Sequence, residues 1–414
     1  MPPQEPIRDR AGVDAVVKEA RAEGRAAIDL EFLWERTYAP LACLAQVATA
    51  RGVHLVDPID GAPLEPIAEL VSDPDVAVVM HAPSADLALL GMAYGTRPAN
   101  FHDVQVTAGF VGLGAGQGLA ALLERVLGVH LDKGERYTDW SRRPLSRAQL
   151  AYAAGDVTDL LALADELERR ARALGRWDWV GEEHARRYGP GARLVPDPAQ
   201  SWRRVKGQGR LSGRDRAVLA AVAEWRENEA RRRDKPTAWV VPDRTLVEIA
   251  RRRPADRRAL GSERGLPDRM RPADLDGLLA ALRRGEEADP IALPPPPSHE
   301  MQQRLEVLGP LGAVMVAARA AAVDLAPTLL ATRDEISAFL AAVVEGDPDE
   351  HPLGSGWRRE LAGEALTDLV RGRLALAADD DPPYLVEIPR EGAEAGTGGT
   401  RVRDGRPSGE EISR

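Results

Sequence analysis

The chain has 414 residues, of which 44% are hydrophobic and 29% charged, so it is long enough for two or three globular domains and is not disordered overall. A single cysteine, Cys43, excludes an internal disulfide framework and is typical of a reducing compartment. The N-terminus lacks the apolar run of a secretory signal, and the longest apolar run, Leu308 to Ala318, is too short to cross a bilayer. We expect a cytoplasmic protein without a membrane segment; its oligomeric state is open, with a monomer favoured.

The charge is distributed unevenly along the chain. The net charge is −10, yet residues 201–290 contain 22 Lys and Arg against 15 Asp and Glu. A basic segment beside an acidic body suggests a module that docks on a polyanion, attached to an acidic body that binds metal. A basic surface that is merely solvated is the alternative.

The first 175 residues alternate between helical and strand patterns, which indicates an α/β domain. Arg51 and Gly52 separate two apolar runs in the manner of a hairpin, so the sheet should begin as an antiparallel meander. Ser84 is a plausible N-cap. The spacing predicts helices at 11–24, 62–71, 84–92, 104–111, 119–127 and 146–174, and strands at 26–32, 41–50, 53–56 and 76–80.

The sequence pattern changes after residue 175. Residues 181–198 have the pattern of an irregular segment, and two helical regions follow, separated by a proline-rich stretch that predicts a stiff linker. Acids, prolines and glycines then dominate, which predicts disorder. The expected division is a first domain at 1–175, a connecting segment at 176–208, a helical domain at 209–286, a linker at 287–298, a second helical domain at 299–376 and a tail at 377–414.

Two acids interrupt the apolar strand at 26–32. Asp29 and Glu31 are two residues apart, so their side chains share one face of the strand. Burying two like charges side by side is costly unless a cation neutralises them, and Mg²⁺ or Mn²⁺ prefers oxygen ligands. The alternative is a strand whose acidic face is solvated.

The helix that begins at Ser146 has the clearest start signal in the chain. Ser146 and Gln149 form an S-x-x-Q capping box. Tyr152 and Asp156 follow at i, i+4 spacing and share one helix face. Gly155 between them predicts a close approach of the backbone to a neighbouring segment. An exposed hydrogen-bonding Tyr–Asp pair is the alternative.

The sequence lacks the motifs of several common enzyme classes. The glycine-rich run at 112–118 matches neither G-x-x-x-x-G-K-[ST] nor G-x-G-x-x-G, so we expect a flexible loop there. The sequence contains no H-E-x-x-H pair, no paired C-x-x-C and no G-x-S-x-G elbow. The usual motifs of zinc and serine-hydrolase chemistry are therefore missing.

Three motifs, taken in order, resemble a known family. They are Asp29-Leu30-Glu31-Phe32 with the following Glu35-Arg36-Thr37-Tyr38, the segment from His81 to Asp86, and Tyr152-Ala153-Ala154-Gly155-Asp156. Together they resemble the tyrosine subclass of the DEDD superfamily of 3′-to-5′ exonucleases, and within it the ribonuclease D family. The residues Glu224-Trp225-Arg226 and 236–250 resemble a helicase and RNase D C-terminal (HRDC) domain, and 299–373 resembles a divergent second copy.

The resemblance implies a ribonuclease-H-like exonuclease domain of mixed sheet and helices, followed by two small all-α HRDC-type domains. It implies a metal-dependent 3′-to-5′ exoribonuclease that releases nucleoside 5′-monophosphates, with RNA such as transfer RNA precursors as substrate. Asp29, Glu31, Asp86 and Asp156 would hold two divalent ions, Mg²⁺ or Mn²⁺, and Tyr152 would position the attacking water. The alternatives are a 3′-to-5′ DNA exonuclease and a catalytically inactive protein that binds nucleic acid.

Other residues near these motifs allow more than one interpretation. Asp103 is a lesser site candidate or a helix N-cap. His81 is a poor ligand for Mg²⁺, so we expect it to be a buried hydrogen-bonding residue. Phe32 could stack on a terminal base or belong to the core. Lys133, Arg142 and Arg143 could contact phosphates or simply be solvated.

Overall fold

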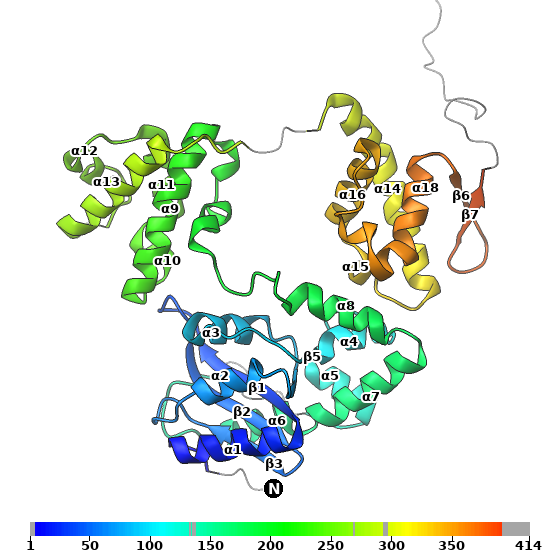
Figure 1. Ribbon diagram of the computed structural model, residues 1–414, viewed down its shortest axis with the longest axis horizontal. Coiled ribbons are helices and arrows are strands. Elements are labelled where there is room, and N and C mark those ends of the chain that lie inside the picture. Colours follow the sequence, from blue (N-terminus) through cyan, green and yellow to red (C-terminus); the bar gives the residue numbers. More distant parts are fainter. Residues whose placement is uncertain (1–4, 132–133, 135–137, 268–269, 293–296, 391–414) are drawn as a thin grey trace, which may run out of the picture. The chain divides into compact units, whose positions relative to one another are not determined.

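The computed structural model describes residues 5–131, 134, 138–267, 270–292 and 297–390. The chain divides into two compact units, Met1–Pro296 and Pro297–Arg414. The first contains a five-stranded sheet with its helices and then a group of helices; the second is mainly helical (Figure 1).

The sheet is mixed, with the order β3-β2-β1-β4-β5. Its first three strands form an antiparallel meander, and β4 and β5 pair in parallel fashion beyond β1. The predicted mixed α/β architecture is therefore confirmed. The strands are β1 (Arg25–Leu33), β2 (Leu41–Thr49), β3 (Gly52–Val56), β4 (Ala77–Met80) and β5 (Phe101–Asp103).

Helices cover both faces of the sheet, and β1 contributes alternate residues to each face. Ile28 and Leu30 pack in a core with α1 (Arg10–Glu23), α2 (Glu65–Val71) and α3 (Ser84–Tyr94). Ala27 packs on the opposite face with the other helices, so Asp29 and Glu31 also point to that face. The helices of that face are α4 (Val104–Phe110), α5 (Leu119–Leu127), α6 (Arg147–Thr158) and α7 (Leu160–Ala173).

The predicted capping box of α6 is confirmed. The Ser146 hydroxyl accepts from the Gln149 backbone N–H, and the Gln149 side chain accepts from the Ser146 N–H. The single helix predicted at 146–174 is wrong, because α6 ends at Thr158 and α7 starts at Leu160. The Thr158 hydroxyl donates to the Ala154 carbonyl oxygen at 2.6 Å. Such bonds back to the preceding turn often bend helices.

Two local predictions in this unit are corrected. Residues 181–188 are not irregular, because they belong to helix α8 (Trp177–Tyr188). Its buried face includes Glu183, which is paired with two arginines, so apolar spacing alone does not reveal the helix. Ser84 is not an N-cap: it is the first residue of α3, and its hydroxyl hydrogen-bonds with Tyr188.

A helical group completes the first unit. Its core lies between α9, α11 and α13 and includes Trp202 from a preceding 3₁₀ turn and Tyr38 from the loop after β1. The Tyr38 hydroxyl donates to Glu227 of α9 at 3.0 Å, so this loop is attached to the helical group. The helices are α9 (Gly213–Arg233), α10 (Thr237–Val240), α11 (Asp243–Arg252), α12 (Arg257–Gly261) and α13 (Pro272–Glu287), after 3₁₀ turns at Pro198–Arg204 and Gln208–Arg210.

The second unit packs its helices around buried residues that include Met315, Phe339 and Trp357. Among the described residues, α14 alone is long and apolar enough to cross a membrane, at 24 residues, so the apolar run predicted at 308–318 is part of a longer helix. The helices are α14 (His299–Ala322), α15 (Pro327–Leu330), α16 (Arg333–Glu345), α17 (Gly356–Arg358) and α18 (Glu364–Val370), with a 3₁₀ turn at Pro352–Gly354 and a π turn at Arg359–Gly363.

A hairpin follows α18 where disorder was predicted. Strands β6 (Leu374–Ala378) and β7 (Leu385–Pro389) pair in antiparallel fashion. Arg319 of α14 donates to both carboxylate oxygens of Glu387 at 2.6 Å, which holds the hairpin on the helices. The tail predicted from residue 377 is therefore wrong as far as Pro389, and 391–414 lies outside the described residues.

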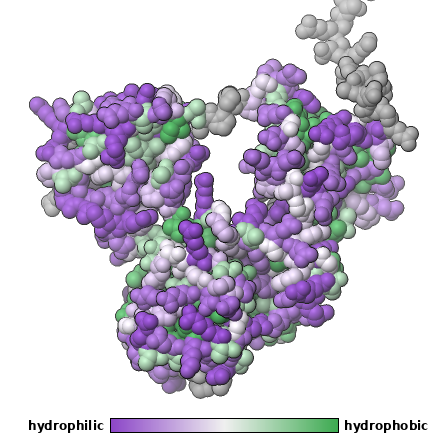
Figure 2. Space-filling view, in the orientation of Figure 1, coloured by the Kyte–Doolittle hydropathy of each residue, from purple (hydrophilic) through white to green (hydrophobic). Residues whose placement is uncertain are grey.

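Hydrophilic residues cover most of the face drawn in Figure 2.

Candidate active site

Three of the predicted acids meet on the α6 face of the sheet. Carboxylate oxygens of Asp29, Glu31 and Asp156 all lie within 4.8 Å of one another. Asp29 and Glu31 come from β1, and Asp156 comes from α6, which packs over β1, β2 and β3. The strand thus supplies a pair of carboxylates, and the covering helix supplies the third.

Asp86 adjoins this triplet from the first turn of α3. It is buried, and its negative charge raises the pKa of both Asp29 and Glu31. Burial raises the pKa of Asp86, and a backbone hydrogen bond from Leu30, the residue between the two strand acids, offsets part of that rise. The four acids predicted from sequence therefore lie at one place in the fold.

The pKa values in this cluster are raised. Burial, together with the charges of Asp86, Asp156 and Glu31, raises the pKa of Asp29 well above its usual range. Burial and the neighbouring acids raise the pKa of Glu31 to about 8, and burial raises that of Asp86 to about 7. Four carboxyl groups in this arrangement favour bound cations, and oxygen donors suit hard divalent metals. The residues present thus fit a site for hard divalent cations.

Tyr152 lies one turn before Asp156 on the same helix and is half-buried. Its ring is 6.1 Å from that of Trp140, which is buried against β2 and β3 residues. Gly155 has the close neighbour expected for it, because a Cβ atom there would lie 2.8 Å from the Leu131 side chain. Phe32, the other aromatic residue considered, is partly buried and packs against the core.

A buried polar network supports the turn before Asp86. Asp103 caps α4 by accepting from the Gln105 N–H, as the N-cap interpretation predicted. It also accepts from the Ala82 N–H at 3.0 Å and from the Tyr188 hydroxyl at 2.7 Å. Ala82 has a φ of 51°, a conformation that is uncommon for a residue with a side chain. Asp103 therefore holds the turn that leads into α3.

Two histidines lie close to this network. The Nε2 atom of His81 is 2.9 Å from the Gln117 carbonyl oxygen, and burial lowers the pKa of His81. His81 is thus a hydrogen-bonding residue, as expected, but it is partly rather than fully buried. His184 of α8 lies beside the Asp103 backbone. Sequence reasoning missed His184 and Tyr188 because the helix that carries them was not predicted.

Arg143 has a structural role, whereas the sequence predicted either a phosphate contact or a solvated side chain. Its guanidinium donates to Asp57, which is 1% exposed, and to the carbonyl oxygens of Cys43 and Trp140. It therefore ties the loop before α6 to β2 and the end of β3, and its partly buried guanidinium is engaged by these partners. Arg142 is exposed and pairs with Asp139 at 3.1 Å. Lys133 lies outside the described residues.

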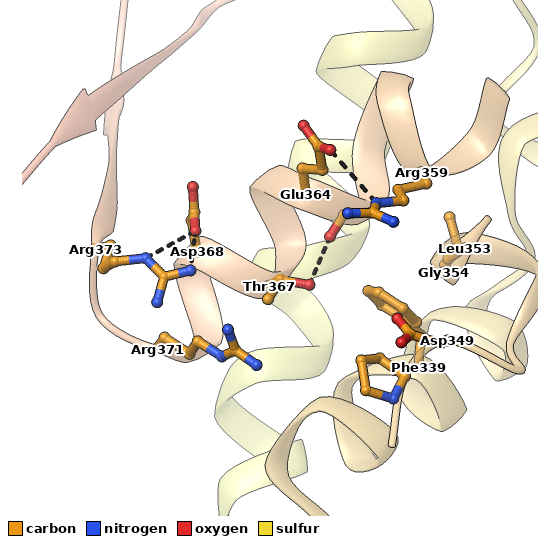
Figure 3. A pocket seen from close by; sticks show the side chains of 12 residues that line it. Phe339, Asp349, Leu353, Gly354, Arg359, Glu364, Thr367, Asp368, Arg371 and Arg373 are labelled. Atoms are coloured by element: carbon orange, nitrogen blue, oxygen red, sulfur yellow. Dashed lines mark hydrogen bonds and ion pairs between the residues drawn. The ribbon is translucent and has the colours of Figure 1, made fainter. Parts of the chain in front are cut away.

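A separate cavity of about 330 Å³ lies in the second unit (Figure 3). Phe339, Leu353 and Thr367 line it together with charged residues such as Arg371. Arg359 pairs there with Glu364 and Arg373 pairs with Asp368, so two of its arginines are already neutralised. The carboxylate cluster of the first unit has no part in this cavity.

Comparison with known proteins identifies the family. A family model described as 3′-5′ exonuclease matches residues 4–172, and an HRDC domain model matches 215–282. The ribonuclease D of Gluconacetobacter diazotrophicus is 37% identical over 375 residues, which cover 88% of this chain and 92% of that protein. The chain belongs to the ribonuclease D family. The ribonuclease D of Acidiphilium cryptum is 35% identical, with 92% of this chain and 97% of that protein covered.

A solved structure of this family has the same fold. The crystal structure of Escherichia coli RNase D, described as an exoribonuclease involved in structured RNA processing, superimposes with a TM-score of 0.73 at 28% identity, covering 89% of this chain and 98% of that one. The predicted family, exonuclease fold and HRDC domain are thereby confirmed. The number of HRDC domains in this ribonuclease D relative is still a prediction.

Proposed function

We propose that Asp29, Glu31, Asp86 and Asp156 hold two divalent ions, Mg²⁺ or Mn²⁺, at which this chain hydrolyses RNA. The enzyme is a 3′-to-5′ exoribonuclease of the ribonuclease D family. The observation that carries the metal assignment is the meeting of three carboxylates within 4.8 Å, with Asp86 beside them. Divalent ions bound there would supply positive charge to the phosphoryl centre and to the departing 3′ oxygen.

Residues of the chain would bind the cations, support the turn before Asp86 and position the attacking water. The four acids would hold the cations, and Asp103 with Tyr188 keeps the turn before Asp86 in place. Tyr152, on the Asp156 face of α6, positions the water that attacks the terminal phosphodiester. The expected products are nucleoside 5′-monophosphates.

The proposed substrates are RNA 3′ ends, with transfer RNA precursors as the first candidates. The basic helical group from Pro198 to Ile291 would hold the RNA backbone, because phosphate contacts dominate the affinity of such interfaces. We also propose that residues 299–376 form a second, divergent HRDC-like domain, which the β6–β7 hairpin follows. A cytoplasmic monomer without a membrane segment is part of the same proposal.

A substitution at Asp156 tests the metal assignment. Asp156→Asn should abolish the metal-dependent release of mononucleotides from an RNA oligomer while the circular dichroism spectrum is unchanged. Asp159→Asn is the matched control, because Asp159 lies just after α6 and its side chain makes no capping hydrogen bond. Full activity in Asp156→Asn would refute the assignment, as would equal losses in the two variants.

A second assay separates the alternatives. Matched RNA and DNA oligomers of one sequence should be degraded at different rates, with RNA preferred. Preference for DNA would favour the DNA exonuclease. Degradation of neither oligomer, with binding retained, would favour an inactive protein that binds nucleic acid.

A further inference from the structure

Gln46 of β2 is a buried polar residue whose side-chain amide has no hydrogen-bond partner among the described residues. Its side chain is 0% exposed, and neither its amide nitrogen nor its amide oxygen makes a hydrogen bond in the part of the chain that the structure describes. Buried polar groups are nearly always hydrogen-bonded, because leaving one unsatisfied costs free energy. An apolar residue of similar size would fill this position at less cost, so the amide calls for a functional explanation.

The register of the sheet places Gln46 beside the candidate active site. Gln46 is paired directly with Asp29 across the β1–β2 ladder, and residues opposite one another in antiparallel strands project on the same face. Its neighbours on β2, Leu44 and Ala48, pack under α6 and α7. The Gln46 amide therefore points to the face that carries Asp29, Glu31 and Asp156.

The ladder pairing makes a contact between the two side chains possible. Cβ atoms of directly opposed residues lie about 4.5 to 5.5 Å apart, so a glutamine amide is within reach of the opposing carboxyl group. Asp29 has acids for neighbours in Asp86, Asp156 and Glu31. A carboxylate that binds a cation through one oxygen keeps lone pairs that an N–H donor can satisfy, and such outer contacts orient the ligand.

We propose that Gln46 is a positioning residue for the cation site: its Nε2 group donates to the Asp29 carboxylate once divalent cations are bound. This inference rests on the proposed metal site and adds a residue to it.

A purely structural role is the competing explanation. Among the described residues, the buried N–H group of Trp140 also has no partner, and Trp140 belongs to one core cluster with Leu44 and Leu55, which flank Gln46 on the same face. An internal water could satisfy Gln46 and Trp140 together. In that case Gln46 would stabilise the metal-free fold and have no influence on cation binding.

The test uses Gln46→Met in the full-length protein, because methionine is similar in size and has no amide. Mn²⁺ affinity is measured by electron paramagnetic resonance of free Mn²⁺, and the metal-free variant is unfolded in urea. We expect Mn²⁺ to bind about 10 to 100 times more weakly. The urea midpoint of the metal-free protein should be unchanged or higher.

Leu55→Met is the matched control, because Leu55 lies opposite Gln46 on β3 in the same face and has no polar group. It should leave Mn²⁺ affinity unchanged. The proposal is overturned if Gln46→Met binds Mn²⁺ within about twofold of the wild type, or if both variants lose affinity equally. A lower urea midpoint with unchanged affinity would establish the water-bridged role instead.

The same titration separates this inference from the metal site itself. If the wild type binds no Mn²⁺, the proposed metal site fails and Gln46 loses its role with it. If the wild type binds Mn²⁺ and Gln46→Met binds it equally well, the metal site stands and only the role of Gln46 is refuted. Gln46→Leu takes the place of Gln46→Met if the latter does not fold.

Discussion

The Tyr188 hydroxyl donates a 2.7 Å hydrogen bond to the Asp103 carboxylate. This bond links α8, the last helix of the nuclease fold, to the residue that holds the turn before Asp86. The same carboxylate accepts from the Ala82 N–H, four residues before Asp86. A residue more than 100 positions away in the sequence therefore stabilises the turn from which Asp86 projects. Tyr188 and Asp103 can stabilise this turn without contacting the substrate.

Tyr188→Phe should destabilise the protein and slow the reaction. Removing one partner of the buried Asp103 carboxylate costs about 1 to 3 kcal/mol of unfolding free energy. Turnover should fall because the turn before Asp86 is less well held. Urea unfolding and nucleotide release measure the two effects. Tyr94→Phe is the control, since Tyr94 is 41% exposed, and its stability should change by less than about 0.5 kcal/mol.

The metal-free enzyme should lose stability as the pH rises, in part through Glu31. The pKa of Glu31 is raised from 4.5 to about 8, so the folded state holds a proton that the unfolded state has released. The stabilisation from this group is complete below pH 4.5 and is lost as the pH rises through about 8. Added Mg²⁺ should restore stability at the higher pH.

Glu31→Gln isolates this effect, because glutamine stands in for the protonated carboxyl group. Urea unfolding in the presence of a chelator, at several values between pH 5 and about pH 8.5, gives the difference between wild type and variant. The wild type should lose stability relative to the variant over that interval. Parallel curves for the two proteins would contradict the raised pKa.

Tyr152→Phe should lower kcat more than it raises KM if Tyr152 positions the attacking water. The phenyl ring can keep its packing beside Trp140, which lies 6.1 Å away between ring centres, so the fold should be retained. Single-turnover and steady-state assays on an RNA oligomer separate the two parameters. A large rise in KM with normal kcat would assign Tyr152 to substrate binding.

Replacing two basic residues of the HRDC-containing helical group should weaken the salt dependence of RNA binding. Arg210 and Arg244 line one surface hollow with Lys206, and among the described residues neither arginine has an ion pair. If both contact phosphates, the double change to Gln should reduce the slope of log affinity against log salt by about 1.4 for single-stranded RNA.

Arg257→Gln is the control for that experiment, because Arg257 is already paired with Asp276 on the same helical group. It should leave the salt slope unchanged. Equal slopes for the wild type and the double variant would show that this hollow does not hold the RNA backbone.

Local patterns predicted much of the fold because the forces behind them act over a few residues. The capping box at Ser146 and the alternation along β1 depend on neighbours within one turn or one strand, and both were found as predicted. Helix α8 was missed because its buried face includes the charged Glu183, whose arginine partners make burial acceptable. The hairpin after α18 was missed because Glu387 is held by Arg319, 68 residues earlier.

The sequence alone supplied the motifs by which the chain resembles its family, and that resemblance implied the five candidate site residues. Strand and helix periodicity by themselves put Asp29 with Glu31, and Tyr152 with Asp156, on shared faces. The tertiary structure alone decided which groups surround them. The partly buried Arg143 donates to Asp57, Asp103 holds the turn before Asp86, and Gln46 lies opposite Asp29. Each of these contacts joins segments distant in the chain, and such contacts depend on how sheet and helices pack.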